Sequence, residues 1–144
     1  MSAVNRKPRT VLVLDDDLAY LRMVERLLTL RGYRAIIAER PGEFFASLAR
    51  STPDLVMLDV NMPEMDGFEV YRRISHTHPN LPVLFVTGFP ASFKAGCARV
   101  QEVWGTRVNE HQTGFLYKPY RMDDLWAKIG ALLGDDVKPA STVA

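Results

Sequence analysis

The chain has 144 residues, 47% of them hydrophobic and 24% charged, which is the length and composition of one ordinary globular domain. A formal net charge of +1 excludes a general attraction to nucleic acid or a membrane surface, because both depend on a concentrated basic field. The lone cysteine, Cys97, excludes an internal disulfide and is expected to be a small buried apolar residue. With no signal-peptide core and no apolar run near the roughly 18 residues that span a bilayer, the sequence predicts a cytoplasmic protein without membrane contact.

Five short apolar runs predict strands. Each run is continuous rather than alternating, which is typical of parallel strands that helices cover on both faces. The runs are Val11–Leu14, Ala35–Ala38, Leu55–Leu58, Val83–Val86 and Phe115–Tyr117.

Helical patterns follow the strands in turn. The first stops at Gly32, an expected C′ residue, and the second has Pro41 in its first turn. The fourth is weakened by Gly96 and is expected to end at Gly105. The apolar stripes comprise Leu18, Leu21, Val24, Leu27 and Leu28; Phe44, Phe45 and Leu48; Gly67, Val70, Tyr71 and Ile74; Phe93, Cys97, Val100 and Trp104; and Met122, Leu125, Trp126, Ile129, Leu132 and Leu133.

Strict alternation of strand and helix predicts an α/β fold, a doubly wound parallel sheet with helices on both faces. We expect the folded domain to cover residues 9–134, with flexible tails at 1–8 and 135–144. Between Gly105 and Gly114 two glycines enclose a polar stretch, which predicts an exposed loop.

Polar and reactive residues follow four of the strands. In an open parallel sheet, ligands bind outside the carboxyl ends of the strands, so these residues are expected to converge. They are Asp15, Asp16 and Asp17 after the first strand, Asp59 after the third, Thr87 after the fourth and Lys118 after the fifth.

Several carboxylates in one place repel one another. Two charges 4 Å apart interact by about 4 kcal/mol at an effective dielectric near 20, and a cation would relieve this. Oxygen-only ligands with room for water suit Mg²⁺ better than a full Ca²⁺ cage. Asp17 is expected instead to cap the following helix. Taken alone, Thr87 could be an ordinary strand residue and Lys118 a solvated charge, and only their placement together with the aspartates indicates a site.

Four segments resemble the receiver domain of bacterial two-component response regulators, here in a stand-alone form. They are Val11–Asp17 (VLVLDDD), Asp54–Gly67 (DLVMLDVNMPEMDG), Val83–Thr87 (VLFVT) and Phe115–Pro119 (FLYKP). The resemblance covers nearly the whole chain and implies a five-stranded, flavodoxin-like (βα)₅ fold with strand order 2-1-3-4-5.

The resemblance also implies a phosphoacceptor site. Asp59 would take a phosphoryl group from the phosphohistidine of a sensor histidine kinase or a phosphotransfer protein. Asp16 and Asp59 would bind Mg²⁺ directly, Asp15 through water, and the backbone carbonyl of Asn61 would supply another oxygen. Pro119 matches a family proline that follows a cis peptide bond.

The resemblance assigns further residues to the conformational response and to the lifetime of the phosphorylated state. Lys118 would neutralise charge, Thr87 would bond a phosphoryl oxygen, and Phe115 would be the aromatic switch, with a core aromatic as its alternative role. Asn61 and Phe89 would border the path of water to the phosphorus. Because Phe89 forms no conventional hydrogen bond and its ring would exclude water if it lies over the site, we expect slower self-dephosphorylation than with a carboxamide or carboxylate at that position; the alternative is that Phe89 packs in the following loop.

The domain is therefore expected to be a signalling phosphoacceptor rather than an enzyme, and to act on an unknown downstream protein through a conformational switch. No helix-turn-helix follows residue 134, so direct nucleic-acid binding is not expected, whereas a homodimer on phosphorylation is compatible with the reading. Two departures mark the output region: Thr87 and Lys118 are 118 − 87 = 31 residues apart, more than the family usually has, and Gly88 replaces the usual alanine.

Three other classes compete with this interpretation. A haloacid dehalogenase-type phosphatase expects an aspartate at position 61, where this chain has Asn61. A pseudo-receiver usually loses an acidic residue or the lysine, and this chain keeps them. An FMN-binding flavodoxin needs a phosphate loop after the first strand, which is absent. His76 and His78 have no further metal ligands nearby in sequence and are read as a solvated helix end.

Overall fold

The computed structural model describes residues 7–88 and 112–134. The expected fourth helix, Cys97, Phe89 and most of both expected tails lie outside these ranges. The elements, in chain order, are β1 (Thr10–Leu14), α1 (Leu18–Leu30), β2 (Arg34–Ala38), α2 (Pro41–Arg50), β3 (Leu55–Asp59), α3 (Gly67–Thr77), β4 (Val83–Thr87), β5 (Thr113–Tyr117) and α5 (Met122–Leu133).

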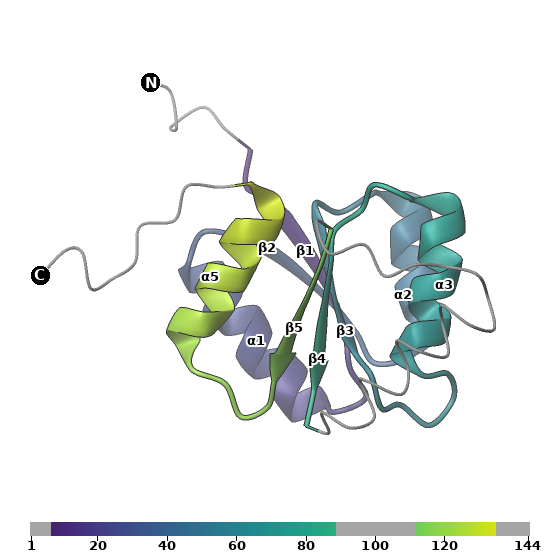
Figure 1. Cartoon of the computed structure of the whole chain (residues 1–144), viewed down its shortest axis with the longest axis horizontal. Coiled ribbons are helices and arrows are strands. Elements are labelled where there is room, and N and C mark those ends of the chain that lie inside the picture. Colours follow the sequence, from purple (N-terminus) through teal and green to yellow (C-terminus); the bar gives the residue numbers. More distant parts are fainter. Residues whose placement is uncertain (1–6, 89–111, 135–144) are drawn as a thin grey trace, which may run out of the picture.

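The five strands form one parallel sheet in the order β2-β1-β3-β4-β5, which confirms the predicted doubly wound α/β fold. Helices α1 and α5 cover one face of the sheet, and α2 and α3 cover the other (Figure 1). No helix in these two ranges is long and apolar enough to cross a membrane.

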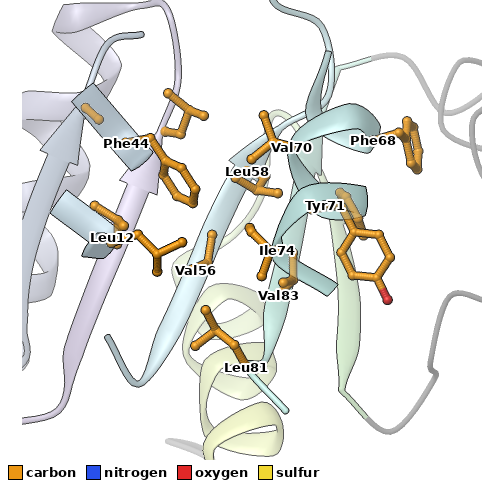
Figure 2. Packing of buried hydrophobic residues seen from close by; sticks show 14 of the residues in the cluster. Leu12, Phe44, Val56, Leu58, Phe68, Val70, Tyr71, Ile74, Leu81 and Val83 are labelled. Carbon is orange, nitrogen blue, oxygen red and sulfur yellow. The ribbon is translucent and has the colours of Figure 1, made fainter. Parts of the chain in front are cut away.

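Each central strand sends alternate side chains to opposite faces of the sheet, so the core is divided into two clusters. In β1, for example, Leu12 and Leu14 face α2 and α3, whereas Val11 and Val13 face α1 and α5. Figure 2 shows the first cluster. In this cluster, the ring of Phe85 in β4 contacts two aromatic rings of α3. The centroid distance is 5.1 Å to Phe68 and 5.3 Å to Tyr71.

The prediction that all five strands are buried on both faces is wrong for β2 and β5. Both lie at the edges of the sheet, and in each strand only one residue, Ala38 or Leu116, is fully buried. An edge strand has a neighbour on one side only, so helices cover it less completely. Burial on both faces holds for β1, β3 and β4.

The ends of the helices follow the local sequence signals. Asp17 is the N-cap of α1, and its side chain accepts a hydrogen bond from the Tyr20 backbone amide. Gly32 has a φ of 98° and follows the C-cap of α1, where the Tyr33 amide donates to the Leu28 carbonyl in a Schellman arrangement. Helix α2 begins with Pro41, as predicted.

Other expectations need correction or limits. Leu18, placed in the apolar stripe of α1, is 36% exposed, because it lies in the first turn beyond the edge of the core. Thr113 and Gly114, placed in the expected loop, belong to β5 because they pair with Val83 and Leu84. Residues 105–111 of that loop lie outside the described ranges. The two histidines, at positions 76 and 78, lie at the end of α3, as expected.

Candidate functional site

The predicted site residues lie together where the carboxyl ends of neighbouring strands meet, here called the carboxyl edge of the sheet. The β3–β4 ladder pairs Asp59 with Val86, and the β4–β5 ladder pairs Thr87 with Tyr117. The Lys118 amide continues the second ladder by donating to the Thr87 carbonyl oxygen at 2.8 Å. Side chains far apart in the sequence therefore lie at the same level of the sheet.

Asp59 and Thr87 were predicted to follow their strands, but each is the last residue of its strand. Both are buried, with 8% and 0% of their surface exposed. The sheet ladder extends one residue further than the apolar runs because backbone pairing does not depend on an apolar side chain. The backbone of each reactive group is therefore held by the sheet itself.

Three carboxylates gather at this edge. One oxygen from each of Asp15, Asp16 and Asp59 lies within 4.8 Å of the others. Asp15 and Asp59 are buried, whereas Asp16 is exposed and leaves the cluster open to water on its side. A small all-oxygen donor set with room for water is the arrangement that Mg²⁺ prefers, so these residues fit that ion.

Lys118 supplies a positive charge to the cluster. Its Nζ donates to Asp15 Oδ2 at 2.8 Å, and the other Asp15 oxygen accepts the Asp17 backbone amide at 2.9 Å. The Asp15 side chain is only 2% exposed, whereas that of Lys118 is 28% exposed, so the carboxylate of this pair is shielded from water and the ammonium is partly accessible. Both oxygens of Asp15 are therefore engaged by the protein.

The surroundings of Asp59 disfavour its charged form. Burial raises the pKa of the Asp59 carboxyl to about 6, and the negative charge of Asp15 adds to this rise. The Lys118 charge and the Asn61 backbone amide act in the opposite direction. The ionised form of Asp59 is thus less favoured than that of an exposed aspartate, and a nearby cation would stabilise it.

Asn61 links the ends of β3 and β4. Its side-chain amide donates to the Thr87 hydroxyl oxygen at 3.3 Å, and its backbone amide lies 3.4 Å from Asp59 Oδ1. An amide at this position cannot act as the general acid that a haloacid dehalogenase-type phosphatase would need. The suggested contact between a metal and the Asn61 carbonyl stays a prediction.

Gly67 allows helix α3 to begin directly against the backbone of Asp59. A Cβ at position 67 would overlap the Asp59 carbonyl oxygen and stand 3.1 Å from the Cα of Val60. The Gly67 amide also donates to the Val60 carbonyl at 3.0 Å. The glycine that ends the DLVMLDVNMPEMDG segment thus has a packing role beside Asp59.

Two tyrosines that were not predicted from the sequence complete the surroundings of Lys118. Lys118 Nζ lies 4.0 Å from the centre of the Tyr20 ring, and the hydroxyl groups of Tyr20 and Tyr120 are 2.7 Å apart. Tyr120 could have been noticed from its position two residues after the lysine. Tyr20 carried no sequence signal, because an aromatic residue near a helix start is usually a packing residue.

A cavity of about 280 Å³ opens beside Asp16. It lies between the loops that follow β1, β2 and β3, so it borders the acidic cluster. Its lining carries both signs of charge. The other lining residues are Glu39, Arg40, Pro41, Met62, Pro63 and Glu64.

The proposed switch residue Phe115 lies on the edge strand β5. Its side chain is 43% exposed, so the alternative role as a core aromatic is wrong. Its ring contacts Tyr117 at a centroid distance of 5.4 Å, and Lys128 Nζ lies 5.4 Å from the ring centre. Phe89, the other predicted neighbour of the site, lies outside the described residues.

Comparisons with known proteins agree with this geometry. The family model described as the response regulator receiver domain matches residues 11–130. Response regulator MprA of Mycobacterium sp. (strain KMS) is 34% identical over 126 residues, which cover 88% of this chain and 51% of that protein. Transcriptional regulatory protein GlrR of Escherichia coli (strain K12) is 32% identical over 126 residues, covering 88% of this chain and 26% of that protein.

A solved structure is also similar. The structure of the chemotaxis protein CheY4 of Vibrio cholerae has a TM-score of 0.74 and 26% sequence identity, and the match covers 88% of this chain and 99% of that one. The chain therefore belongs to the response regulator receiver domain family of two-component signalling. Receiver domains are signalling phosphoacceptor domains that bind Mg²⁺ at an acidic cluster, and response regulators act with histidine kinases and downstream effectors. This chain spans about half the length of MprA.

Proposed function

We propose that this chain accepts a phosphoryl group on Asp59 in an Mg²⁺-dependent reaction. The observation that carries the proposal is the cluster itself: a buried Asp59 carboxylate beside Asp15 and Asp16, with the Lys118 ammonium bonded to Asp15. A structural ion pair would not need a third carboxylate facing water. The arrangement suits a site that holds a cation and a phosphoryl group side by side.

The acidic residues bind the metal in two ways, directly or through water. Asp16 and Asp59 are the direct ligands in this proposal, and the Asn61 carbonyl is a third. Asp15 acts through water, which agrees with both of its oxygens already having protein donors. When bound, Mg²⁺ supplies charge neutralisation for the incoming phosphoryl group.

The transfer itself needs alignment more than covalent assistance. An Asp59 oxygen forms a bond to the phosphorus of a phosphohistidine while the phosphorus–nitrogen bond breaks, and the electron pair of that bond stays on the imidazole nitrogen. Lys118 stabilises the charge on the phosphoryl oxygens. Thr87, whose hydroxyl lies at the end of the strand next to Asp59, donates a hydrogen bond to one of them.

The conformational change that follows phosphorylation then reaches strand β5. Thr87 accepts a hydrogen bond from the Asn61 side-chain amide, and a hydroxyl can accept one hydrogen bond while it donates another to a phosphoryl oxygen. Phe115 lies two strand positions before Tyr117, which pairs with Thr87. We propose that this segment reports phosphorylation to a downstream protein or to a second copy of the chain, and that a sensor kinase or phosphotransfer protein is the donor.

Incubation with acetyl phosphate and Mg²⁺ tests the proposal. Intact mass should increase by one phosphoryl group, and hydroxylamine should remove it because the product is an acyl phosphate. Asp59→Asn should abolish the increase, because an amide forms no acyl phosphate. Asp54→Asn is the matched control: Asp54 is exposed and precedes the same strand at the opposite edge of the sheet, so this variant should be phosphorylated like the parent.

A phosphoryl group retained on Asp59→Asn would place the acceptor elsewhere. Lys118→Ala should still accept some phosphate but should lose the conformational response, measured as the change in tryptophan fluorescence or in dimerisation on phosphorylation. Phe89→Gln should shorten the lifetime of the phosphorylated protein if Phe89 shields the phosphorus from water. Decay no faster than in the parent would contradict that assignment.

A further inference from the structure

A pair of tyrosines adjoins the reactive lysine although their positions are 100 residues apart in the sequence. Tyr20 lies in the first turn of α1, and Tyr120 lies between β5 and α5. Their hydroxyl oxygens are 2.7 Å apart, and their rings meet edge to face at an interplanar angle of 85°. Burial raises the pKa of both phenols, so both stay neutral and hydrogen-bonded at neutral pH.

Lys118 lies between this pair and the acidic cluster. Its Nζ is 4.0 Å from the centre of the Tyr20 ring and 2.8 Å from Asp15 Oδ2. The aromatic face attracts the ammonium through its quadrupole, and the carboxylate attracts it by charge and a hydrogen bond. These two contacts restrict where the ammonium can lie, although a lysine side chain otherwise has many rotamers.

We propose that Tyr20 is a positioning residue for Lys118, and that Tyr120 holds the Tyr20 ring in place through the hydroxyl contact. The inference rests on the proposed phosphorylation of Asp59. When a phosphoryl group arrives, Lys118 must exchange Asp15 for a phosphoryl oxygen. An aromatic face beside the ammonium attracts it in both positions and restricts its movement, so that fewer conformations have to be sampled before the productive geometry is reached.

The competing explanation is that Tyr20 only fills space between α1 and the β5–α5 connection. The two explanations differ in one respect: positioning acts through Lys118, whereas space filling does not. A double-mutant cycle with Lys118→Ala therefore separates them. Tyr33→Leu is the matched control, because Tyr33 stacks on Trp126 and precedes the amino end of β2, whereas Lys118 follows the carboxyl end of β5.

The test measures the rate of Asp59 phosphorylation over a range of acetyl phosphate concentrations with saturating Mg²⁺. We expect Tyr20→Leu to lower the maximal rate about threefold to tenfold, the range that one cation–π contact supplies, with little change in the half-saturating concentration. Tyr20→Phe and Tyr120→Phe, which keep both rings and are milder for folding, should lower it by about twofold. In the Lys118→Ala background, Tyr20→Leu should change the rate no further.

A second measurement does not depend on phosphorylation. Protons at the end of Lys118 lie over the Tyr20 ring, so their NMR resonances should be shifted upfield by the ring current. The shift should persist in Tyr20→Phe and disappear in Tyr20→Leu. Circular dichroism and thermal unfolding check that each variant is folded.

The outcomes separate the two proposals. A parent protein that acetyl phosphate does not modify on Asp59 overturns the proposed function, whatever the tyrosine variants do. A phosphorylated parent with Tyr20→Leu equal to it overturns the positioning role. A loss of equal size in the Lys118→Ala background, or a Lys118 signal without the ring-current shift, also overturns that role.

Discussion

Two carboxylates flank the same strand, β3, and their surroundings differ. Asp54 precedes the strand, is exposed, and accepts the Thr10 backbone amide at 2.7 Å through Oδ2. Asp59 ends the strand, is 8% exposed, and lies among the oxygens of two other aspartates. The first carboxylate links strands β1 and β3 from the solvent side, and the second is a charged group that the fold partly withholds from water.

The difference has a topological cause. At the carboxyl edge, strands β1, β3, β4 and β5 all deliver polar side chains to the same place, as the parallel arrangement in Figure 1 requires. At the amino edge, the turns before β3 and β4 instead border an open cavity of about 350 Å³ whose lining includes Asp54 and His78. The strand therefore has an exposed carboxylate hydrogen-bonded to a backbone amide at one end and a buried carboxylate in an acidic cluster at the other.

The largest expected effect is on stability at neutral pH in the absence of divalent ions. The folded protein binds a proton at Asp59 more tightly than the unfolded chain does, with a pKa of about 6 against 3.8. The stability that Asp59 contributes is therefore full below pH 3.8 and is lost as the pH rises to about 6. Asp59→Asn, which carries no charge, should exceed the parent in unfolding free energy by about 1 to 3 kcal/mol at pH 7.

Urea unfolding at several pH values with a chelator present measures the difference in unfolding free energy between Asp59→Asn and the parent. This difference should be near zero at pH 3.5, rise until about pH 6 and then stay constant. Added Mg²⁺ should reduce it, because a cation in the cluster stabilises the ionised form of Asp59 in the parent. A difference that is independent of pH would mean that Asp59 is not held in an unfavourable charged state.

Gly67→Ala tests how closely the backbone at the active end of β3 is packed. Because the new methyl group would overlap the Asp59 carbonyl oxygen, we expect a loss of about 1 to 3 kcal/mol and slower phosphorylation. Gly42→Ala is the control, since a Cβ there meets nothing within 4 Å and a helical alanine should stabilise α2 by up to about 1 kcal/mol. Thermal unfolding compares the two, and equal effects would contradict the close approach.

Mg²⁺ should stabilise the protein through the carboxyl edge alone. At ten times its dissociation constant, the ion should add about 1.4 kcal/mol to the free energy of unfolding by mass action. Asp16→Ala should remove most of this gain, whereas Asp54→Ala should keep it. A calorimetric Mg²⁺ response that survives in Asp16→Ala would rule out Asp16 as a ligand.

The smallest change in the free energy of unfolding is expected at the amino ends of the strands. Asp54→Ala removes the acceptor for the Thr10 amide and should cost about 0.5 to 1 kcal/mol, because that amide can bond to water instead. Phosphorylation by acetyl phosphate should be unchanged. A large loss in the denaturant midpoint would show that the exposed carboxylate stabilises the sheet more than an ordinary surface contact does.

Local patterns were enough to predict much of this molecule. The five apolar runs located the five strands of the described residues, and the strand ends identified Asp15, Asp16, Asp59, Thr87 and Lys118 as one group. The caps at Asp17 and Gly32 were also predictable, because a cap depends on a few neighbouring residues. These predictions hold because side-chain burial and backbone capping depend on residues that are close together in the sequence.

The tertiary structure decided the remainder. The sequence by itself determined that α/β layering occurs and which side chains collect at the carboxyl edge, since these follow from periodicity and from parallel strand direction. Only the packed structure showed that the ammonium of Lys118 lies over Tyr20, that Gly67 abuts the Asp59 carbonyl, and that β2 and β5 are incompletely covered. Periodicity reports which face of an element is buried, whereas contacts between distant segments depend on how whole elements pack against one another.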